Sequence, residues 1–353
     1  MLEKKKILFL VEALSCGIFT YIVDLANGLV DSFDIYIVHA IRPQTPKNYK
    51  DYFDKRVKLI KVENLRREIK PAQELKAIKE VREIAEQIKP DIIHLHSTKA
   101  GAIGRLAFNG KNVPLFYTPH GYSFLIQNYS PLKRMVFKGI EAILAKRNCT
   151  TISCGLGEHK ETLKFTKNAT YINNAINVEE LEKSLSGMKK EDHPFTVFTL
   201  GRISYQKNPA LFNKIAEKMP DTKFLWVGDG ELKNELTSKN IEITGWVTRE
   251  DALNASVNAD VFLLTSLWEG LPISLLESMY MKKLCVVSNV IGNRDVIKNG
   301  ENGFVCDSLD EFVDAINSNS KELVDKAYQD LITEYNTKEQ IKRYAEIYRN
   351  AVK

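Results

Sequence analysis

The sequence lacks any apolar run of the roughly 20 residues that a membrane-spanning helix needs. Its start, MLEKKKILFLVEAL, is basic, but the apolar stretch is short, is interrupted by Glu12 and has no small-residue cleavage site, which predicts a first β-strand rather than a signal peptide. The five cysteines are odd in number and show no Cys-x-x-Cys spacing, which indicates neither a disulfide framework nor a zinc site. These absences predict a soluble protein of a reducing compartment, the cytoplasm.

Glycine and proline, at 18 and 11 of 353 residues, are too few for a collagen-like or linker-dominated chain. The hydrophobic fraction of 44% excludes a disordered one. At about 100–200 residues per domain, the length predicts two domains, each able to bury a core of its own.

Short apolar runs alternate with amphipathic stretches, a pattern typical of parallel sheets covered by helices on both faces. A first series of predicted strands covers residues 7–11, 34–40, 57–62, 91–96, 115–118, 150–153 and 170–172. After a polar stretch, a second series covers residues 196–200, 224–227, 241–244, 261–265, 285–288 and 304–306. We therefore predict two doubly wound α/β domains, residues 1–172 and 173–336, whose strand carboxyl ends face each other across a ligand-binding cleft.

The last stretch, TKEQIKRYAEIYRNAVK, predicts a terminal helix over about residues 337–353. Its apolar residues fall on one helical face, which indicates that this face packs against a core: Ile341, Tyr344, Ile347 and Tyr348.

The segment TSLWEGLPISLLE places Glu269 on the loop after a predicted strand and Glu277 about one turn into the next helix. The turn of Gly270, Leu271 and Pro272 directs backbone N–H groups and the positive end of the helix at one point, which suits a phosphate. The two carboxylates suit the vicinal hydroxyls of a sugar or ribose, which donate hydrogen bonds to them. The structural alternative is a solvated loop glutamate beside a helix-capping one.

The segment FTLGRISYQKNP carries two cations after a strand, Arg202 beside Gly201 and Lys207 just before a helix start. Together with the helix N-terminus they suit a pyrophosphate. The next strand ends in WVGDGEL, where Gly228 and Gly230 allow close backbone approach to a ligand, although any tight turn uses such glycines. No Walker A pattern and no complete Gly-x-Gly-x-x-Gly occur, so kinase and NAD-binding fingerprints are missing.

Histidines follow two strands of the first half. His94 and His96 alternate on one strand and so share a face, but no third metal ligand is apparent, and a hydrogen-bonded buried histidine is the commoner role. His120 follows the next strand and is the better functional candidate. No Asp-x-Asp pair occurs anywhere, which argues against a metal-chelated diphosphate.

The motifs follow one another over essentially the whole chain, in the order SCGIFTYIVDLANGL, HSTKAG, YTPHG, GRISYQKN, VGDGEL, SLWEGLPISLLE and IGNRDVIKNGENGF. With them the chain resembles the family 4 retaining glycosyltransferases of the GT-B fold, of the bacterial polysaccharide and lipopolysaccharide type. The resemblance implies two Rossmann-like domains facing across a cleft, and a final helix that returns to the first domain. It also implies metal-independent transfer without a cofactor, from a nucleotide-sugar that the family favours as UDP-linked.

The resemblance also implies residue roles. Arg202 and Lys207 would hold the diphosphate, and Glu277 the ribose. Glu269 and the backbone of Gly270–Leu271 would hold the transferred sugar. Additional contacts would come from Gly17 to the diphosphate and from His120 to the sugar near the reaction centre.

The chain departs from the family pattern at three places. Cys16 replaces the first glycine of the N-terminal pair, Phe19 replaces a common acidic residue, and Ala175-Ile176-Asn177 replaces the usual hinge Gly-Val-Asp. The first two departures lie on the acceptor side, to which we also assign Ser97 and Lys99.

Charge is divided unevenly along the chain. Residues 1–172 hold 28 Lys and Arg against 17 Asp and Glu, a net charge of +11, and the remainder has a net charge of −6. Within the basic half, residues 128–148 form an amphipathic segment with apolar Leu132, Val136, Ile140 and Ile143 at helical spacing. Such a helix can lie on an anionic membrane surface. The commoner alternative is a helix whose apolar face packs on the sheet.

We therefore expect a retaining hexosyltransferase that acts on a lipid-linked or growing glycan acceptor, in contact with the inner face of the cell membrane. No nucleophile stands out, which favours front-face substitution, with diphosphate charge stabilised by Arg202, Lys207 and helix N-termini. Other readings are a GT-B-like epimerase, a phosphorylase and a non-catalytic sugar-nucleotide-binding or glycan-binding protein. Nucleic-acid binding would also fit a basic half, but no recognition motif supports it.

Overall fold

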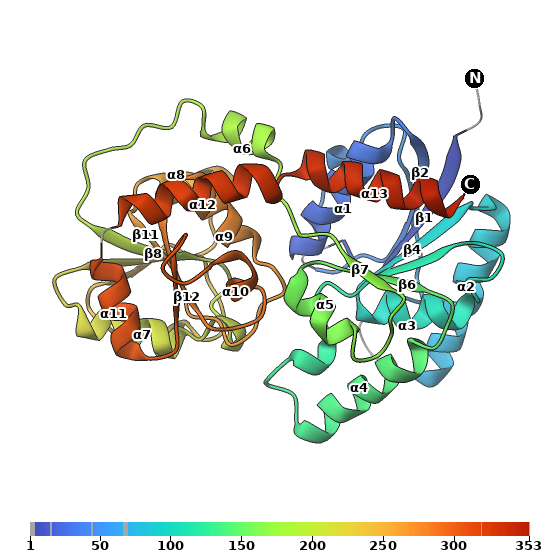
Figure 1. Ribbon diagram of the computed structural model, residues 1–353, viewed down its shortest axis with the longest axis horizontal. Coiled ribbons are helices and arrows are strands. Elements are labelled where there is room, and N and C mark those ends of the chain that lie inside the picture. The colour runs from blue at the N-terminus through green and yellow to red at the C-terminus, as the bar shows by residue number, and fades with distance from the viewer. Residues whose placement is uncertain (1–3, 15, 44, 66–69, 319, 353) are drawn as a thin grey trace. The chain divides into compact units, whose positions relative to one another are not determined.

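The computed structural model describes residues 4–352 except 15, 44, 66–69 and 319, and for Cys16 the backbone only. The chain divides into two compact units (Figure 1). Unit 1 comprises Met1–Asn174 together with Thr337–Lys353, and unit 2 comprises Ala175–Asn336.

Unit 1 contains a parallel sheet in the order β3-β2-β1-β4-β5-β6-β7. Its strands are β1 (Lys5–Val11), β2 (Phe33–His39), β3 (Lys58–Lys61), β4 (Ile92–His96), β5 (Leu115–Thr118), β6 (Thr150–Ser153) and β7 (Ala169–Tyr171). The predicted strands are confirmed to within one residue at each end, except that β1 begins two residues before the predicted start. The strand order reverses between β1 and β4, so the loops after these strands diverge and leave room for a ligand at the carboxyl edge.

Helices cover both faces of this sheet. They are α1 (Cys16–Leu29), α2 (Pro71–Ile88), α3 (Thr98–Ala107), α4 (Pro131–Leu144), α5 (Leu156–Thr162) and α13 (Thr337–Ala351), with short 3₁₀ turns η1 (Tyr49–Tyr52) and η2 (Ser123–Leu125). Alternate residues of β1 serve the two faces: Phe9 joins the cluster under α1 and α13, whereas Leu8 and Leu10 join the cluster under α2 and α3.

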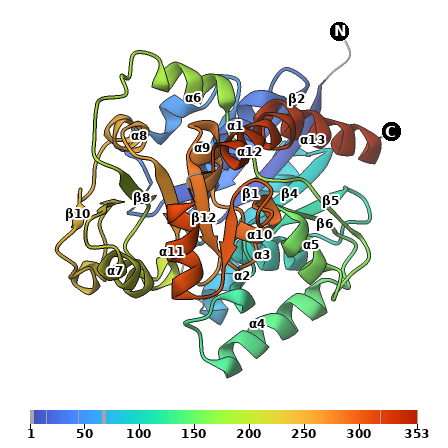
Figure 2. The ribbon, with the colours of Figure 1, turned by 60° about the vertical axis from the view of Figure 1, so that its left-hand side comes forward.

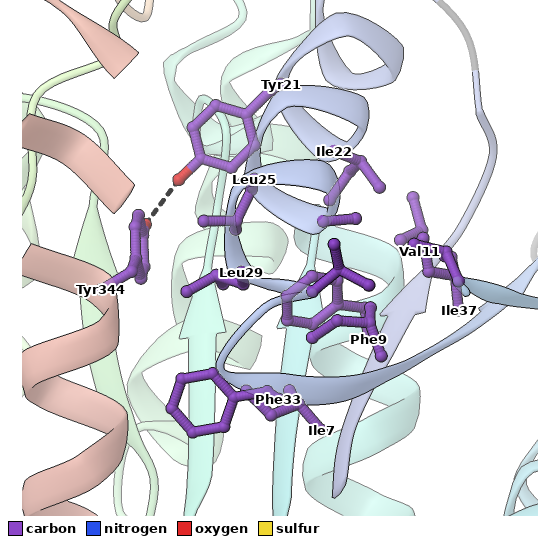
Figure 3. Packing of buried hydrophobic residues seen from close by; sticks show 14 of the residues in the cluster. Ile7, Phe9, Val11, Tyr21, Ile22, Leu25, Leu29, Phe33, Ile37 and Tyr344 are labelled. Carbon is purple, nitrogen blue, oxygen red and sulfur yellow. Dashed lines mark hydrogen bonds between the residues drawn. The ribbon is translucent and has the colours of Figure 1, made fainter. Parts of the chain in front are cut away.

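The last helix, α13, completes the core of unit 1 under α1, as the resemblance implies. Tyr344 and Tyr348 are fully buried there, and Ile341 and Ile347 pack against the same cluster. Figure 3 shows Tyr344 facing Tyr21 of α1, with their hydroxyls hydrogen-bonded. The two helices approach so closely that a Cβ on Gly28 would lie 2.1 Å from a methyl group of Ile341.

The helix α4 lies at the periphery of unit 1 (Figure 1). Only Glu141 and Leu144 of this helix are buried. The predicted apolar face does not pack on the sheet, because Leu132, Val136, Ile140 and Ile143 are 66%, 51%, 40% and 68% exposed. The commoner alternative is therefore wrong for this helix.

A buried charged cluster ties α4 to the rest of the unit. The guanidinium of Arg105 on α3 donates to the Glu141 carboxylate at 2.8 Å, and the Tyr117 hydroxyl donates to its other oxygen at 3.0 Å. The guanidinium also stacks over the Tyr117 ring, 4.1 Å from its centroid. Together with the apolar contacts of Leu144 and Phe137, this cluster anchors α4 to unit 1.

Unit 2 contains a second parallel sheet in the order β10-β9-β8-β11-β12-β13. Its strands are β8 (Thr196–Leu200), β9 (Lys223–Val227), β10 (Ile241–Ile243), β11 (Val261–Leu264), β12 (Leu284–Ser288) and β13 (Phe304–Cys306), again within one residue of the predicted ones. One face is covered by α7 (Pro209–Lys218) and α11 (Leu309–Asn317), and the other by α6 (Val178–Leu185), α8 (Arg249–Val257), α9 (Ile273–Tyr280) and α12 (Lys321–Glu334) (Figures 1 and 2). The strand order reverses between β8 and β11.

Candidate functional site

Two of the predicted residues meet where the sheet of unit 2 reverses its strand order. Lys207 follows β8, Glu269 follows β11, and the Lys207 ammonium lies 2.7 Å from a Glu269 carboxylate oxygen. Ligands of open parallel sheets bind at such a switch point, beyond the carboxyl ends of the strands. The pair therefore marks the candidate site of unit 2.

The backbone around Lys207 is shaped by the sequence GRISYQKNP. Gly201 leaves β8 with φ +144°, and Asn208 adopts a left-handed conformation with φ +51° just before Pro209 opens α7. The Thr265 hydroxyl donates to the Lys207 carbonyl at 2.8 Å, which ties this loop to the end of β11. Lys207 is thus held at the start of a helix, beside its carboxylate partner.

The Glu269 carboxylate is almost buried, with 8% of its side chain exposed. Besides Lys207 it accepts hydrogen bonds from the Ser266 hydroxyl at 2.6 Å and from the Gln206 amide at 3.3 Å. A carboxylate can accept about four hydrogen bonds, so capacity remains for a sugar hydroxyl. The same contacts hold Glu269 in one orientation.

Arg202 forms its ion pair with a residue outside the Lys207–Glu269 pair. Its side chain is 59% exposed and donates to Glu231 at 3.0 Å. An exposed ion pair of this kind is weak and readily exchanged for another anion. Arg202 is therefore available to a phosphate without a large cost.

Glu277 is buried on α9 and accepts a hydrogen bond from the Arg249 guanidinium at 2.7 Å. Arg249 could not be singled out from the sequence, where its only signal is its place at the start of α8, directly after the N-capping Thr248. No side chain caps the start of α9, which follows Gly270, Leu271 and Pro272, and the last two are buried. The N-terminal end of α9 thus keeps the polarity that suits an anion.

The glycines of VGDGEL have a different neighbour from the one expected. A Cβ on Gly228 would lie 2.2 Å from the Gly201 carbonyl oxygen, and one on Gly230 would lie 2.0 Å from that of Ile203. The close approach is between the loops after β8 and β9, so packing of these loops already requires both glycines. Their expected contact with a ligand stays a prediction.

Unit 1 has a cavity of about 590 Å³ at the carboxyl edge of its own sheet. Three predicted residues line it: Ser97 and Lys99 after β4, and His120 after β5. Glu12 and Arg42, which form an ion pair, line it as well, and neither was singled out from the sequence for a role there. No sequence motif indicates this ion pair, because Glu12 and Arg42 come from two loops that are far apart in sequence.

The remaining acceptor-side candidates are less informative. Gly17 lies in the first turn of α1, and a Cβ there would meet nothing within 4 Å. Phe19 is buried and packs edge-on against Tyr52 and Phe53, so its side chain belongs to the core of unit 1, and its place on the acceptor side stays a prediction. The side chain of Cys16 lies outside the described residues.

Three histidines form a packed group in unit 1. His94 contacts the Tyr348 hydroxyl and the Thr118 hydroxyl, the second at 2.8 Å, so it is the hydrogen-bonded buried histidine that the sequence favoured. The His120 ring is held by His96 at 3.1 Å and by the Cys154 thiol at 3.4 Å. Among the described residues, no three His, Cys, Asp or Glu side chains are grouped so as to hold a metal ion.

We predict that unit 1 loses stability in acid through these histidines. Burial lowers the pKa of His94 and of His96 well below 6.5, and that of His120 to about 3. Below pH 6.5 the unfolded chain therefore binds more protons than the folded one, and stability falls as pH drops toward about 3. Thermal unfolding followed by circular dichroism between about pH 7 and about pH 4 checks this.

The control for this prediction is His120→Asn, because asparagine tolerates the φ of +54° at this position. Burial raises the pKa values of the neighbouring Tyr21 and Cys154, so both stay neutral over this range. The variant should lose less stability in acid than the parent. An equal loss in both proteins would contradict the assignment to His120.

The two doubly wound units, with a cation–carboxylate pair at the switch point of the second, are the architecture of a GT-B glycosyltransferase. Two family models match: "Glycosyltransferase Family 4" over residues 16–180, and "Glycosyl transferases group 1" over residues 182–346. The chain belongs to the family 4 type of glycosyltransferases with the GT-B fold.

Curated relatives and solved structures agree with this. The chain is 34% identical over 261 residues, 65% of this chain and 66% of the relative, to UDP-Gal:α-D-GlcNAc-diphosphoundecaprenol α-1,3-galactosyltransferase of Escherichia coli. It is 30% identical, over 42% of this chain and 43% of the relative, to an α-1,4-N-acetyl-D-galactosaminyltransferase of Campylobacter jejuni named for a diphosphoundecaprenol-linked acceptor. The matches thus span at most 66% of these two relatives.

Among solved structures, sucrose-phosphate synthase of Thermosynechococcus elongatus superposes with a TM-score of 0.82 at 13% identity, over 98% of this chain and 99% of that one. HepE of Anabaena, solved with UDP and glucose, superposes with a TM-score of 0.74 at 17% identity, over 98% of this chain and 100% of that one. At these identities the likeness establishes the fold.

Proposed function

We propose that this protein transfers a hexose or N-acetylhexosamine from a UDP-sugar to a lipid-linked or growing glycan acceptor in cell-surface polysaccharide synthesis. The observation that carries the proposal is the Lys207–Glu269 pair at the switch point of unit 2, with the exposed Arg202 on the same loop as Lys207 and the N-terminal end of α9 shortly after Glu269. The name of the Escherichia coli relative supports a UDP-sugar donor, and the names of the Escherichia coli and Campylobacter jejuni relatives support a diphosphate-linked acceptor.

Each part of the nucleotide-sugar donor is assigned to the residues whose chemistry suits it. The cations Arg202 and Lys207, with the start of α9, stabilise the charge of the diphosphate as it departs. Glu277 accepts hydrogen bonds from the ribose hydroxyls, and Arg249 orients it. Glu269 accepts hydrogen bonds from the transferred sugar.

We assign a front-face substitution with retention of the anomeric configuration. The bond from the anomeric carbon to the diphosphate oxygen breaks, and the bond to the acceptor oxygen forms on the same face. The proton of the acceptor hydroxyl passes to the departing phosphate oxygen. The Glu269 carboxylate already accepts hydrogen bonds from Lys207, Ser266 and Gln206. These contacts support a role in binding sugar hydroxyls rather than a role as the nucleophile.

Charge neutralisation in this proposal is left to the protein rather than to a metal. Lys207, Arg202 and the α9 terminus supply it, and the sequence has no Asp-x-Asp pair to chelate a metal–diphosphate. Activity that persists unchanged in EDTA is the expected result. Activity lost in EDTA and restored by a divalent cation would overturn this part of the proposal.

Incubation with a panel of UDP-, GDP- and ADP-sugars, with and without a GlcNAc-diphosphate-lipid acceptor, tests the function. A transferase releases nucleoside diphosphate only with acceptor, whereas an epimerase converts the sugar without release. A phosphorylase needs inorganic phosphate, and a binding protein only raises its melting temperature with a ligand. Release of UDP with acceptor supports the proposal, and each other result replaces it.

We also propose that α4 docks the protein on the cytoplasmic face of an anionic membrane. The exposed apolar residues of this helix stand beside exposed Lys133, Lys138, Lys146 and Arg147, in the half of the chain with net charge +11 (28 Lys and Arg against 17 Asp and Glu in residues 1–172). Apolar insertion and attraction to anionic headgroups add in such a helix. Within the described residues, no helix combines the length and hydrophobicity needed to cross a membrane.

Replacing Leu132 and Val136 of α4 by glutamate should lower binding to phosphatidylglycerol vesicles at low salt at least about tenfold, because each buried apolar side chain contributes about 1.5–3 kcal/mol. Vesicle co-sedimentation measures this. Leu75→Glu is the matched control, since Leu75 is 69% exposed on α2. Binding that the α4 changes leave intact, or no binding by the parent, would remove the docking proposal.

A further inference from the structure

The cavity of unit 1 lies between two helices. The α3 wall consists of Thr98, Lys99, Ala102, Ile103 and Leu106, which share one helical face by their spacing. Along this face the side chains change from polar at Thr98 and Lys99 to apolar at Leu106. The volume of about 590 Å³ is in the usual range of small-molecule sites.

The facing wall comes from α4 and is apolar throughout, with Phe137, Ile140, Ile143 and Leu144. Leu144 is buried, whereas Ile140 and Ile143 are 40% and 68% exposed. These two isoleucines therefore form a rim, where the cavity opens on the exposed face of α4.

The charged side chains at the polar end of the cavity neutralise one another in ion pairs. Lys99 lies 2.8 Å from Glu74, and Arg42 is paired with Glu12. With the Ser97 hydroxyl, these groups offer both donors and acceptors, but no excess of either charge. Such an end suits the hydroxyls of a sugar.

We propose that this cavity holds the first part of the hydrocarbon chain of the lipid-linked acceptor, with the sugar of the acceptor at the ion-paired end. The identity of that sugar head group rests on the proposed function. A free sugar would leave the walls of α3 and α4 facing water, whereas an aliphatic chain removes them from it. The membrane face of α4 and the chain site thus share Ile140 and Ile143.

Calorimetric titration with farnesyl diphosphate and isopentenyl diphosphate tests the chain site without any transfer reaction. The head group is the same, so the difference in affinity measures the chain. The parent protein should bind farnesyl diphosphate at least about tenfold more tightly, because each buried methylene favours binding by several-fold. Equal affinity for the two would overturn the proposal.

Substitutions in the walls of the cavity test whether the hydrocarbon chain binds there. Ala102→Trp fills the space between the helices and should abolish the preference for the longer chain. Ile143→Glu does the same at the rim, and it should fold normally because Ile143 is 68% exposed. Leu132→Glu is the matched control: Leu132 is 66% exposed on the same helix but does not line the cavity. A preference that survives Ile143→Glu, or one lost equally in Leu132→Glu, contradicts the assignment.

Transfer assays with one sugar-diphosphate head on isoprenyl or straight alkyl chains separate this proposal from the proposed function. If UDP is released but KM does not depend on chain length, the function stands and the chain site fails. If no acceptor gives release but the farnesyl preference holds, the site stands and the function fails. Preference for isoprenyl over alkyl chains of equal length identifies a polyprenyl acceptor, and the reverse identifies an acyl lipid.

Discussion

Replacement of Lys207 by alanine is expected to lower the turnover number about 10²–10³-fold, because one preorganised donor to developing negative charge contributes about that much. The Lys207 ammonium is fixed beside Glu269 by the loop that precedes α7, and among the described residues no other cationic side chain pairs with that carboxylate. Steady-state assays of UDP release, at saturating donor and acceptor, measure the effect.

Structural damage must be separated from lost catalysis in this variant. Without Lys207, the Glu269 carboxylate keeps only Ser266 and Gln206, so some stability is also lost. Circular dichroism and thermal melting show whether the variant is folded at the assay temperature. Lys214→Ala, an exposed position on the same helix α7, is the matched control and should keep full turnover. Near-normal turnover of folded Lys207→Ala protein would refute the role given to Lys207.

Removal of Arg105 should have the largest effect on stability. The side chains of Arg105 and Glu141 are 2% and 4% exposed, so Arg105→Ala leaves a carboxylate buried without its cation. Breaking a buried pair in this way costs about 3–5 kcal/mol. Urea unfolding monitored by circular dichroism should therefore show a large loss of stability in unit 1, whereas the fluorescence of the three tryptophans, which all lie in unit 2, serves as the internal reference.

A combined variant distinguishes lost charge pairing from lost packing. Arg105→Met, Tyr117→Phe and Glu141→Leu together remove all three polar partners and should recover most of the stability, because the desolvation cost of the ions disappears. Lys5→Ala, which breaks the exposed Lys5–Asp91 pair of the same unit, should change stability by only about 0–1 kcal/mol. A loss for Arg105→Ala no larger than for Lys5→Ala would contradict the anchoring role of the buried cluster.

The sheets could be predicted almost completely from the sequence. Strands buried on both faces, such as β11, are continuous apolar runs, and the sequence marks them clearly. The face of α13 was also predictable, because Tyr344 and Tyr348 follow helical spacing. The burial of α4 was not: its periodicity is that of any amphipathic helix, and only the fold shows that the apolar side has no protein partner.

The positions of candidate site residues could be predicted where a charged side chain follows the end of a strand, as for Lys207 after β8 and Glu269 after β11. Partners contributed from elsewhere were not. Arg249 reaches Glu277 across 28 positions of sequence, and no local pattern encodes that contact. Gly228 and Gly230 were assigned to a ligand because sequence cannot distinguish close approach of a ligand from close approach of another loop.

The position of α13 has a consequence for biosynthesis. The helix that closes the core of unit 1 is translated after the whole of unit 2, so the unit that begins first on the ribosome is completed last. Until residues 337–351 emerge, the surface of α1 and the strands beneath it lack the tyrosines that cover them. Unit 2, contiguous from Ala175 to Asn336, can finish folding during synthesis, whereas the nascent unit 1 exposes an apolar surface until residues 337–351 have emerged.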